Sequence, residues 1–183
     1  MEKTLQKALV KLSKETLFIL LTVASAVVLP QIFHIVGVGL GVGGQLGQIF
    51  LPMYLPVLII AFYRGIVPGA VTGLLAPLIS FALTNMPQMP VLPYVTVELV
   101  ALGCLGGILS KVKLHAILRV FLAQVGAKMI RLIVFAIASY LSSGVLQASA
   151  LFAGVLRSIP GVVLQLLVVT YLIVKKEKQN KVV

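Results

Sequence analysis

The segment QVGAKMIRLIVFAIASYLS, residues 124–142, decides how the chain folds, because it is apolar enough to cross a bilayer yet carries two cations, Lys128 and Arg131. A charged side chain at membrane depth is costly, about 3 kcal/mol on insertion scales, so it persists only where it faces protein, water or a partner. We therefore expect this helix to supply part of a solute-binding site. The alternative is that one cation snorkels to the membrane surface and the other pairs with Glu98, the only acidic residue predicted inside the membrane.

The composition around this segment is that of a small integral membrane protein. Of the 183 residues, 60% are hydrophobic and only 10% are charged, whereas soluble domains carry about 25% charged residues. We predict one all-α membrane domain covering residues 1–183, with a basic amphipathic lead-in at about 1–15 and a basic tail at about 175–183. The net charge of +11 lies at the chain ends and in short loops, which is typical of contact with anionic lipid rather than nucleic acid.

Apolar stretches predict six transmembrane helices. Pro30 and the glycine run at 37–47 are expected to end the first, because closely spaced glycines disfavour a stable helix. Gly65, Gly69 and Gly73 recur every fourth residue, which predicts close packing between helices in lipid. The six predicted spans cover about residues 16–35, 48–63, 65–83, 94–110, 114–141 and 151–174.

The distribution of lysine and arginine predicts the topology. The N-terminus, the turn at Arg64, the 111–119 loop and the tail hold twelve of the fifteen Lys and Arg residues. By the positive-inside rule, both termini are expected on the cytoplasmic side. Counting about 1.5 Å of rise per residue from the basic loops then places Glu98, Lys128 and Arg157 together in the outer half of the membrane.

These outer residues define the predicted solute site. Three cations against one carboxylate favour an anionic or strongly polar solute, which arginine grips with two parallel hydrogen bonds and lysine holds as a point charge. Residues of the outer loops are expected to close over it. His34 is expected to form a hydrogen bond rather than bind a metal. The predicted solute-binding residues are His34, Asn85, Gln88, Tyr94, Glu98, Gln124, Lys128, Arg131 and Arg157.

The missing motifs narrow the function classes. The single cysteine, Cys104, excludes an internal disulfide, and the chain contains neither a G-x-x-x-x-G-K-[ST] loop nor an H-E-x-x-H motif. We therefore expect a non-catalytic protein without metal or cofactor that depends on a partner for energy. Two alternatives remain open. One is a small membrane enzyme acting on polar lipid headgroups with Glu98 as its base, and the other is a scaffold subunit that binds anionic lipid.

The segment LPMYLPVLIIAFYRGIVPGAVTGLLAPLISFALTNMPQMP, residues 51–90, resembles the substrate-binding S component of an energy-coupling factor (ECF) vitamin transporter. Its end, LTNMPQMP, is similar to an LTGMPPMP-type loop of that family. The resemblance implies capture of a water-soluble vitamin outside a bacterial cell membrane, with a T component and two cytoplasmic ATPase subunits as partners. The family's A-x-x-x-A docking motif corresponds here to TVASA, so Thr22 and Ala26 are expected to contact the T component.

The resemblance also bounds the expected vitamin. Excess positive charge favours niacin, pantothenate or another carboxylate, whereas Glu98 suits a heterocycle such as pyridoxine or hydroxymethylpyrimidine. We expect one of these small vitamins ahead of folate or cobalamin.

Overall fold

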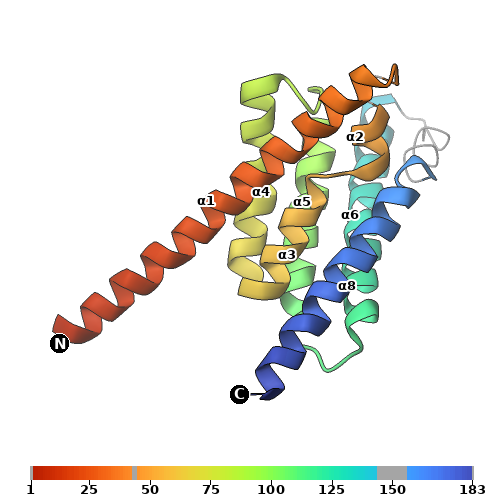
Figure 1. Cartoon of the computed structure of the whole chain (residues 1–183). Coiled ribbons are helices and arrows are strands. Elements are labelled where there is room, and N and C mark those ends of the chain that lie inside the picture. Colours follow the sequence, from red (N-terminus) through yellow and green to blue (C-terminus); the bar gives the residue numbers. More distant parts are fainter. Residues whose placement is uncertain (1, 43–44, 144–155, 183) are drawn as a thin grey trace.

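The computed structural model describes residues 2–42, 45–143 and 156–182, and within these ranges every regular element is an α-helix. Five of the described helices are long and apolar enough to cross a membrane, namely α1, α4, α5, α6 and α8. The predicted all-α class is thereby confirmed for the described residues, and the five apolar helices are consistent with a multi-pass membrane protein. The helices are α1 (Glu2–Gly39), α2 (Gln45–Phe50), α3 (Tyr54–Arg64), α4 (Ile66–Thr84), α5 (Leu92–Leu109), α6 (Ala116–Ser143) and α8 (Ile159–Val182) (Figure 1).

The second predicted span is not one continuous helix. It is divided into α2 and α3 by a break at residues 51–53. Leu51 has a positive φ of 47°, and the residue before a proline is disfavoured in the helical conformation, so Leu51 and Pro52 together end α2. The eleven residues of α3 span only about 16 Å, which is too short to cross a bilayer alone.

The first helix is longer than predicted. It runs without interruption through Pro30 and takes in the expected lead-in from residue 2 and the start of the glycine run. The expectation that Pro30 ends the helix was wrong, since membrane helices tolerate an internal proline when neighbouring groups satisfy the freed carbonyl. Gly41, with φ of 74°, lies just past the end of α1, in the left-handed conformation that commonly follows a helix.

The remaining predicted spans match helices closely. The third, fourth and fifth correspond to α4, α5 and α6 within two residues at each end. Helix α8 begins at Ile159 and continues through the predicted tail to Val182. The predicted start of the sixth span at 151–155, and most of the predicted loop at 142–150, lie outside the described residues.

The centre of the bundle is the contact between α4 and α5. A Cβ atom added at Gly69 would lie 2.7 Å from the carbonyl oxygen of Gly103, and one added at Gly73 would overlap the backbone of Leu99. These approaches require glycine and confirm the predicted packing role of Gly69 and Gly73. Gly65 instead forms the turn between α3 and α4, with φ of 96°.

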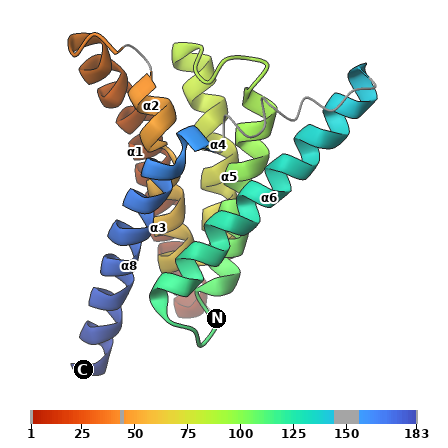
Figure 2. The same ribbon diagram turned by 90° about the vertical axis from the view of Figure 1, so that its right-hand side faces the viewer.

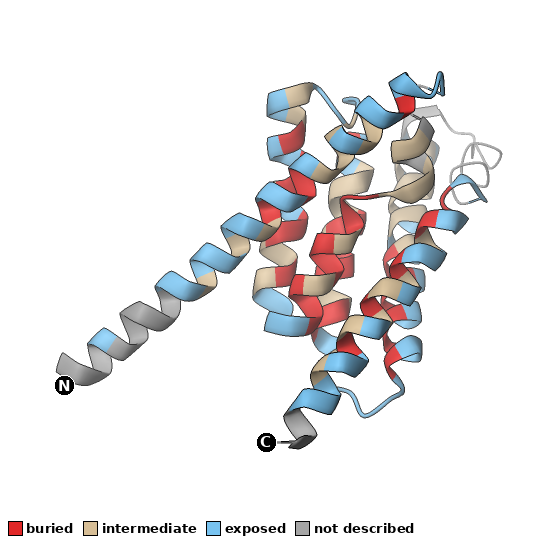
Figure 3. Cartoon of the chain, in the orientation of Figure 1, coloured by how far each residue is buried: buried red, intermediate tan, exposed pale blue. Residues whose placement is uncertain are grey.

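The other helices surround this central pair. Helix α1 packs on α3 and α4, while α6 packs on α5 and α8, and α8 also contacts α2 and α3. Buried residues concentrate in α3, α4 and α5, whereas α1 and α8 expose most of their length, as a lipid-facing perimeter requires (Figure 3). The N-terminal end of α1, the C-terminal end of α8, the α3–α4 turn and the α5–α6 connection lie at one end of the bundle (Figures 1 and 2).

Candidate solute-binding site

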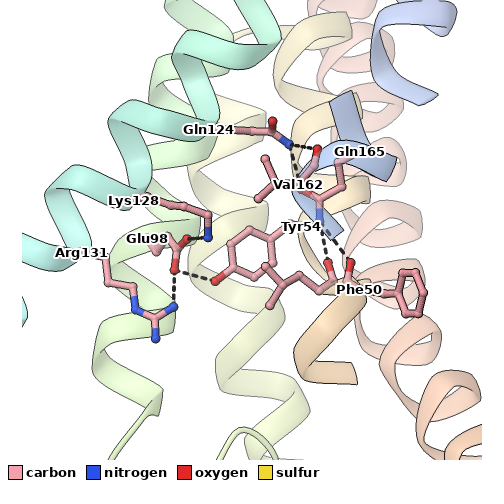
Figure 4. Close-up of polar contacts among 9 residues, drawn as sticks. Phe50, Tyr54, Glu98, Gln124, Lys128, Arg131, Val162 and Gln165 are labelled. Carbon is pink, nitrogen blue, oxygen red and sulfur yellow. Dashed lines mark hydrogen bonds and ion pairs between the residues drawn. The ribbon is translucent and has the colours of Figure 1, made fainter. Parts of the chain in front are cut away.

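Glu98 is the centre of a buried polar group inside the bundle. It lies on α5 with only 1% of its side chain exposed. Its Oε1 accepts a hydrogen bond from Lys128 Nζ at 3.2 Å, and its Oε2 accepts from Arg131 Nη1 at 2.7 Å and from the Tyr54 hydroxyl at 2.7 Å (Figure 4). A buried carboxylate is tolerated only when paired and hydrogen-bonded in this way. We call Tyr54, Glu98, Lys128 and Arg131 the ion cluster.

Three helices bring the ion cluster together. Lys128 and Arg131 stand three residues apart on α6, a spacing that places both on one face, and this face packs on α5. Tyr54 is the first residue of α3. The predicted neighbourhood of both cations and Glu98 is present, and both cations pair with that carboxylate, so neither has to snorkel to the surface.

Charge and exposure are distributed unevenly over the ion cluster. Two cations face one carboxylate, which leaves a net positive charge. The side chain of Arg131 is 30% exposed and that of Lys128 is 18% exposed, whereas Glu98 is almost fully enclosed. Arginine carries five N–H donors, and Arg131 reaches Glu98 through Nη1. The accessible side of the cluster is therefore cationic, with donors to spare.

Aromatic side chains lie beside the ion cluster. The ring of Tyr94 on α5 packs against that of Phe135 on α6, with centroids 5.0 Å apart. Tyr94 precedes Glu98 by four residues and Phe135 follows Arg131 by four, so the aromatic pair is one turn from the ion pair. Tyr94 is the third residue of α5, and Phe135 lies in the C-terminal half of α6. Tyr94 is thus placed beside the predicted site.

Gln124 belongs to a second polar group. Although its spacing predicts a shared face with Lys128, its amide turns to α8 and donates to Gln165 Oε1 at 3.1 Å and to the Val162 carbonyl at 3.3 Å. Its amide is therefore bonded to α8 and not to the cations, because α8 offers it nearby acceptors. Gln165 Nε2 in turn donates to the carbonyls of Phe50 and Leu51 (Figure 4). We call Gln124, Gln165 and these three carbonyls the amide cluster.

The other predicted site residues are dispersed. Asn85 and Gln88 are exposed in the α4–α5 connection, and Asn85 ends α4 in the left-handed conformation with φ of 56°. His34 is half-buried on α1, and Arg157 is exposed two residues before α8. Within the described ranges, no hydrogen bond or ion pair joins any of these four to the ion cluster.

The expected docking residues on α1 differ in accessibility. Ala26 is fully buried in the core of this chain. Thr22 is half-buried, and its hydroxyl donates to the Phe18 carbonyl at 2.6 Å. In this conformation Thr22 is accessible to a partner, whereas Ala26 packs inside the chain.

Sequence reasoning missed three polar residues. Tyr54 lies in the quoted LPMYLPV segment, and its place directly after a proline-induced break is the signal that it begins a new helix. Gln165 interrupts an apolar run, VVLQLLVV, as a buried polar residue would. Arg119, predicted to lie at the end of a basic loop where the next helix begins, is buried and pairs with Glu177 on α8.

No metal site is formed by the residues that the structure describes, because no three His, Cys, Asp or Glu side chains gather among them. Cys104 is a free, half-buried thiol. Compared with protein-family models, curated proteins and solved structures, the chain matches none.

Proposed function

We propose that this chain is a non-catalytic, membrane-embedded subunit that captures a small water-soluble solute carrying a carboxylate or similar anionic group. The observation that carries the proposal is the uneven exposure of the ion cluster. Its carboxylate is enclosed, while the guanidinium of Arg131 and the ammonium of Lys128 keep accessible surface. An anion arriving at this side meets two cations and no competing acceptor from Glu98.

The ion cluster also holds its cations in place before a solute arrives. Both reach Glu98 from neighbouring positions on α6, so little side-chain freedom remains to be lost on binding, which favours affinity. Arg131 can grip a carboxylate with parallel hydrogen bonds while Lys128 adds a point charge. Tyr94 and Phe135, one turn away, supply aromatic surface for a planar ring on the same solute.

The resemblance of residues 51–90 to an ECF S component suggests which solute is captured and which partners are needed. The solute proposed on this basis is a small vitamin such as niacin, pantothenate, pyridoxine or hydroxymethylpyrimidine, with folate and cobalamin as less favoured choices. A T component and two cytoplasmic ATPases power uptake across a bacterial cell membrane. Thr22 and Ala26 are the candidate contacts for the T component, and Thr22 is the more accessible of the two.

The arrangement of the helices supports six crossings with cytoplasmic termini. Helices α2 and α3 follow one another from one end of the bundle to the other, so together they supply the second crossing in the sequence and complete a set of six with the five long helices (Figure 1). The end that holds both termini also carries the exposed cations Lys14, Lys111 and Lys113. Cations gathered at one end are typical of the cytoplasmic side.

A lipid-headgroup enzyme is less favoured by the geometry. Its base would have to be Glu98, but both carboxylate oxygens already accept hydrogen bonds from Tyr54, Lys128 or Arg131. A scaffold that binds anionic lipid would use the same two cations. The source of the anion, soluble or lipid, therefore separates the two binding functions.

Mass spectrometry of small molecules that co-purify with the protein, followed by calorimetry with a panel of carboxylate and heterocyclic vitamins, tests the proposal. We expect one vitamin to bind in neutral lipid nanodiscs, and Arg131→Ala to weaken it by more than about tenfold. Lys113→Ala, which removes an exposed cation from the α5–α6 connection, is the matched control. Well-folded protein that binds no vitamin in the panel, or equal losses in both variants, would refute the proposal. Binding confined to anionic lipid would favour the scaffold.

A further inference from the structure

The ion cluster and the amide cluster form one closed path across the bundle. The path leaves α6 at Gln124, crosses to Gln165 on α8 and reaches the carbonyls of Phe50 and Leu51 at the break. The chain then leads into α3, where the Tyr54 hydroxyl binds Glu98 on α5, and Lys128 closes the path on α6. Gln124 and Lys128 are one helical turn apart. Figure 4 shows both groups in a single view.

The break between α2 and α3 depends on a donor from another helix. The last carbonyls of a helix lack an internal partner, and Pro52 has no N–H to offer. Gln165 Nε2 supplies that partner, lying 3.3 Å from the Phe50 oxygen and 3.1 Å from the Leu51 oxygen. A buried carbonyl without a donor is destabilising, and Gln165 supplies the donor for Phe50, whereas the Leu51 carbonyl also accepts from a backbone N–H.

One acceptor links Gln165 directly to the start of α3. The Leu51 carbonyl accepts from Gln165 Nε2 and also from the backbone N–H of Tyr54, which lies 3.0 Å away. Helix α8 is also seated tightly on this segment, since a Cβ atom at Gly161 would lie 2.6 Å from the Phe50 oxygen. A shift of the break would therefore move Tyr54 with it.

The position of Tyr54 matters for both cations. Its hydroxyl and Arg131 Nη1 donate to the same oxygen, Glu98 Oε2, each at 2.7 Å. Its ring also lies 5.9 Å from Lys128 Nζ, within the range of a cation–π contact. Displacing Tyr54 removes one donor from Glu98 and changes the surface on which Lys128 rests.

We infer that Gln165 is a positioning residue for the ion cluster, although it touches none of its members. By holding the carbonyls at the α2–α3 break, it fixes the place of Tyr54, and through Tyr54 the arrangement of Glu98 and its two cations. The claim that this arrangement sets the affinity for a solute rests on the proposed function. The claim that Gln165 fixes the position of Tyr54 does not depend on it.

Tyrosine 13Cζ NMR of the whole protein in nanodiscs tests the link without a solute. The protein has five tyrosines, and the Tyr54 signal is the one that disappears in Tyr54→Phe. We expect Gln165→Met, which keeps side-chain length but removes the donor, to shift the Tyr54 signal. Gln31→Met is the matched control, because Gln31 Nε2 also donates between helices, to Thr84 Oγ1 on α4 at 3.3 Å. It should leave the Tyr54 signal in place.

A thermal double-mutant cycle gives a second readout. If Gln165 acts through Tyr54, the effects of the two substitutions on Tm should not add, because coupled residues are not additive. The decrease in Tm caused by Tyr54→Phe should then be, in the Gln165→Met background, less than about half of the decrease in the unmodified protein. Tyr54→Phe should add to Gln31→Met. If Gln165→Met does not fold, Gln165→Asn, which keeps the donor on a shorter side chain, should shift the same signal.

The two proposals fail in distinguishable ways. An unmoved Tyr54 signal, together with additive Tm changes, would overturn the positioning role even if a vitamin binds. Absence of vitamin binding with a shifted Tyr54 signal would overturn the capture function alone. Where a vitamin binds, Gln165→Met should weaken it by at least about threefold, and Gln31→Met should not. An unchanged affinity would confine the positioning role to the unliganded protein.

Discussion

Arg131 and Glu98 form an ion pair of very unequal burial. Their Nη1 and Oε2 atoms lie 2.7 Å apart, with 30% of the arginine side chain exposed and 1% of the glutamate. The arginine can therefore reach a second partner while the carboxylate cannot. The pair keeps a cation available to a solute, because the arginine is the accessible partner and cations outnumber the carboxylate in the ion cluster.

Removing the charge of Glu98 should destabilise the protein strongly. Glu98→Gln leaves Lys128 and Arg131 close together without a counter-ion, and breaking a buried pair in this way costs about 3–5 kcal/mol. Thermal unfolding in detergent would measure the loss. Glu15→Gln is the matched control, because the ion pair of Glu15 with Arg64 is partly exposed. The side chain of Glu15 is 29% exposed and that of Arg64 is 33% exposed, and surface pairs contribute about 1 kcal/mol or less. Comparable losses in both variants would contradict the burial argument.

Arginine at position 131 should be needed for its shape as well as its charge. Arg131→Lys keeps the charge but lacks the planar fork that binds a carboxylate with two hydrogen bonds. We expect its affinity for a carboxylate vitamin to fall by about three- to tenfold, between the unmodified protein and Arg131→Ala. Calorimetry with the co-purified vitamin would measure this. If Arg131→Lys kept full affinity, the site would recognise the vitamin by the positive charge at position 131 and not by the shape of the guanidinium.

The Tyr54 hydroxyl should contribute to stability through Glu98. Tyr54→Phe removes one hydrogen bond to a buried charged group, which is worth about 1.5–3 kcal/mol. Unfolding followed by circular dichroism would show the decrease in Tm. Tyr140→Phe makes the same change at an exposed position on α6 and should leave Tm within experimental scatter. If Tyr54→Phe and Tyr140→Phe had the same Tm, the hydrogen bond from Tyr54 to Glu98 would contribute nothing to stability.

The α4–α5 contact should not tolerate a side chain. Gly73→Ala places a methyl group against the backbone of Leu99, where no flexible side chain can yield, so the helices must separate. We expect a loss of at least about 1–3 kcal/mol, as for other overpacked sites. Gly39→Ala is the control, because a Cβ atom there has nothing within 4 Å. The two unfolding midpoints should differ clearly, and equal midpoints would show that α4 and α5 can move apart freely.

Hydropathy predicted most of the helices but not the break, and two prolines show why. Pro30 and Pro52 both lie in apolar stretches, yet α1 continues through the first and α2 ends just before the second. The difference arises partly from Gln165, which lies 114 residues beyond Leu51 in the sequence and stabilises the freed carbonyls. A local hydropathy pattern cannot predict a hydrogen-bond donor that lies so far away in the sequence.

The candidate site was predictable in composition but not in its partners. Charges inside apolar spans are few, so Glu98, Lys128 and Arg131 could be found from residue types alone. Which face each helix turns toward its neighbours is decided by packing, and this placed Gln124 with α8 rather than with the cations. Arg119 shows the same limit, since a residue near a basic loop is buried against Glu177.

The dependence of the α2–α3 break on Gln165 has a consequence for biosynthesis. During translation the second crossing leaves the ribosome more than a hundred residues ahead of its donor, given the 114-residue separation between Leu51 and Gln165. Until α8 has formed, the Phe50 carbonyl lacks the donor that Gln165 supplies, and the Leu51 carbonyl has only the backbone N–H of Tyr54. We therefore expect the α2–α3 break to take its final conformation only after α8 has joined the bundle.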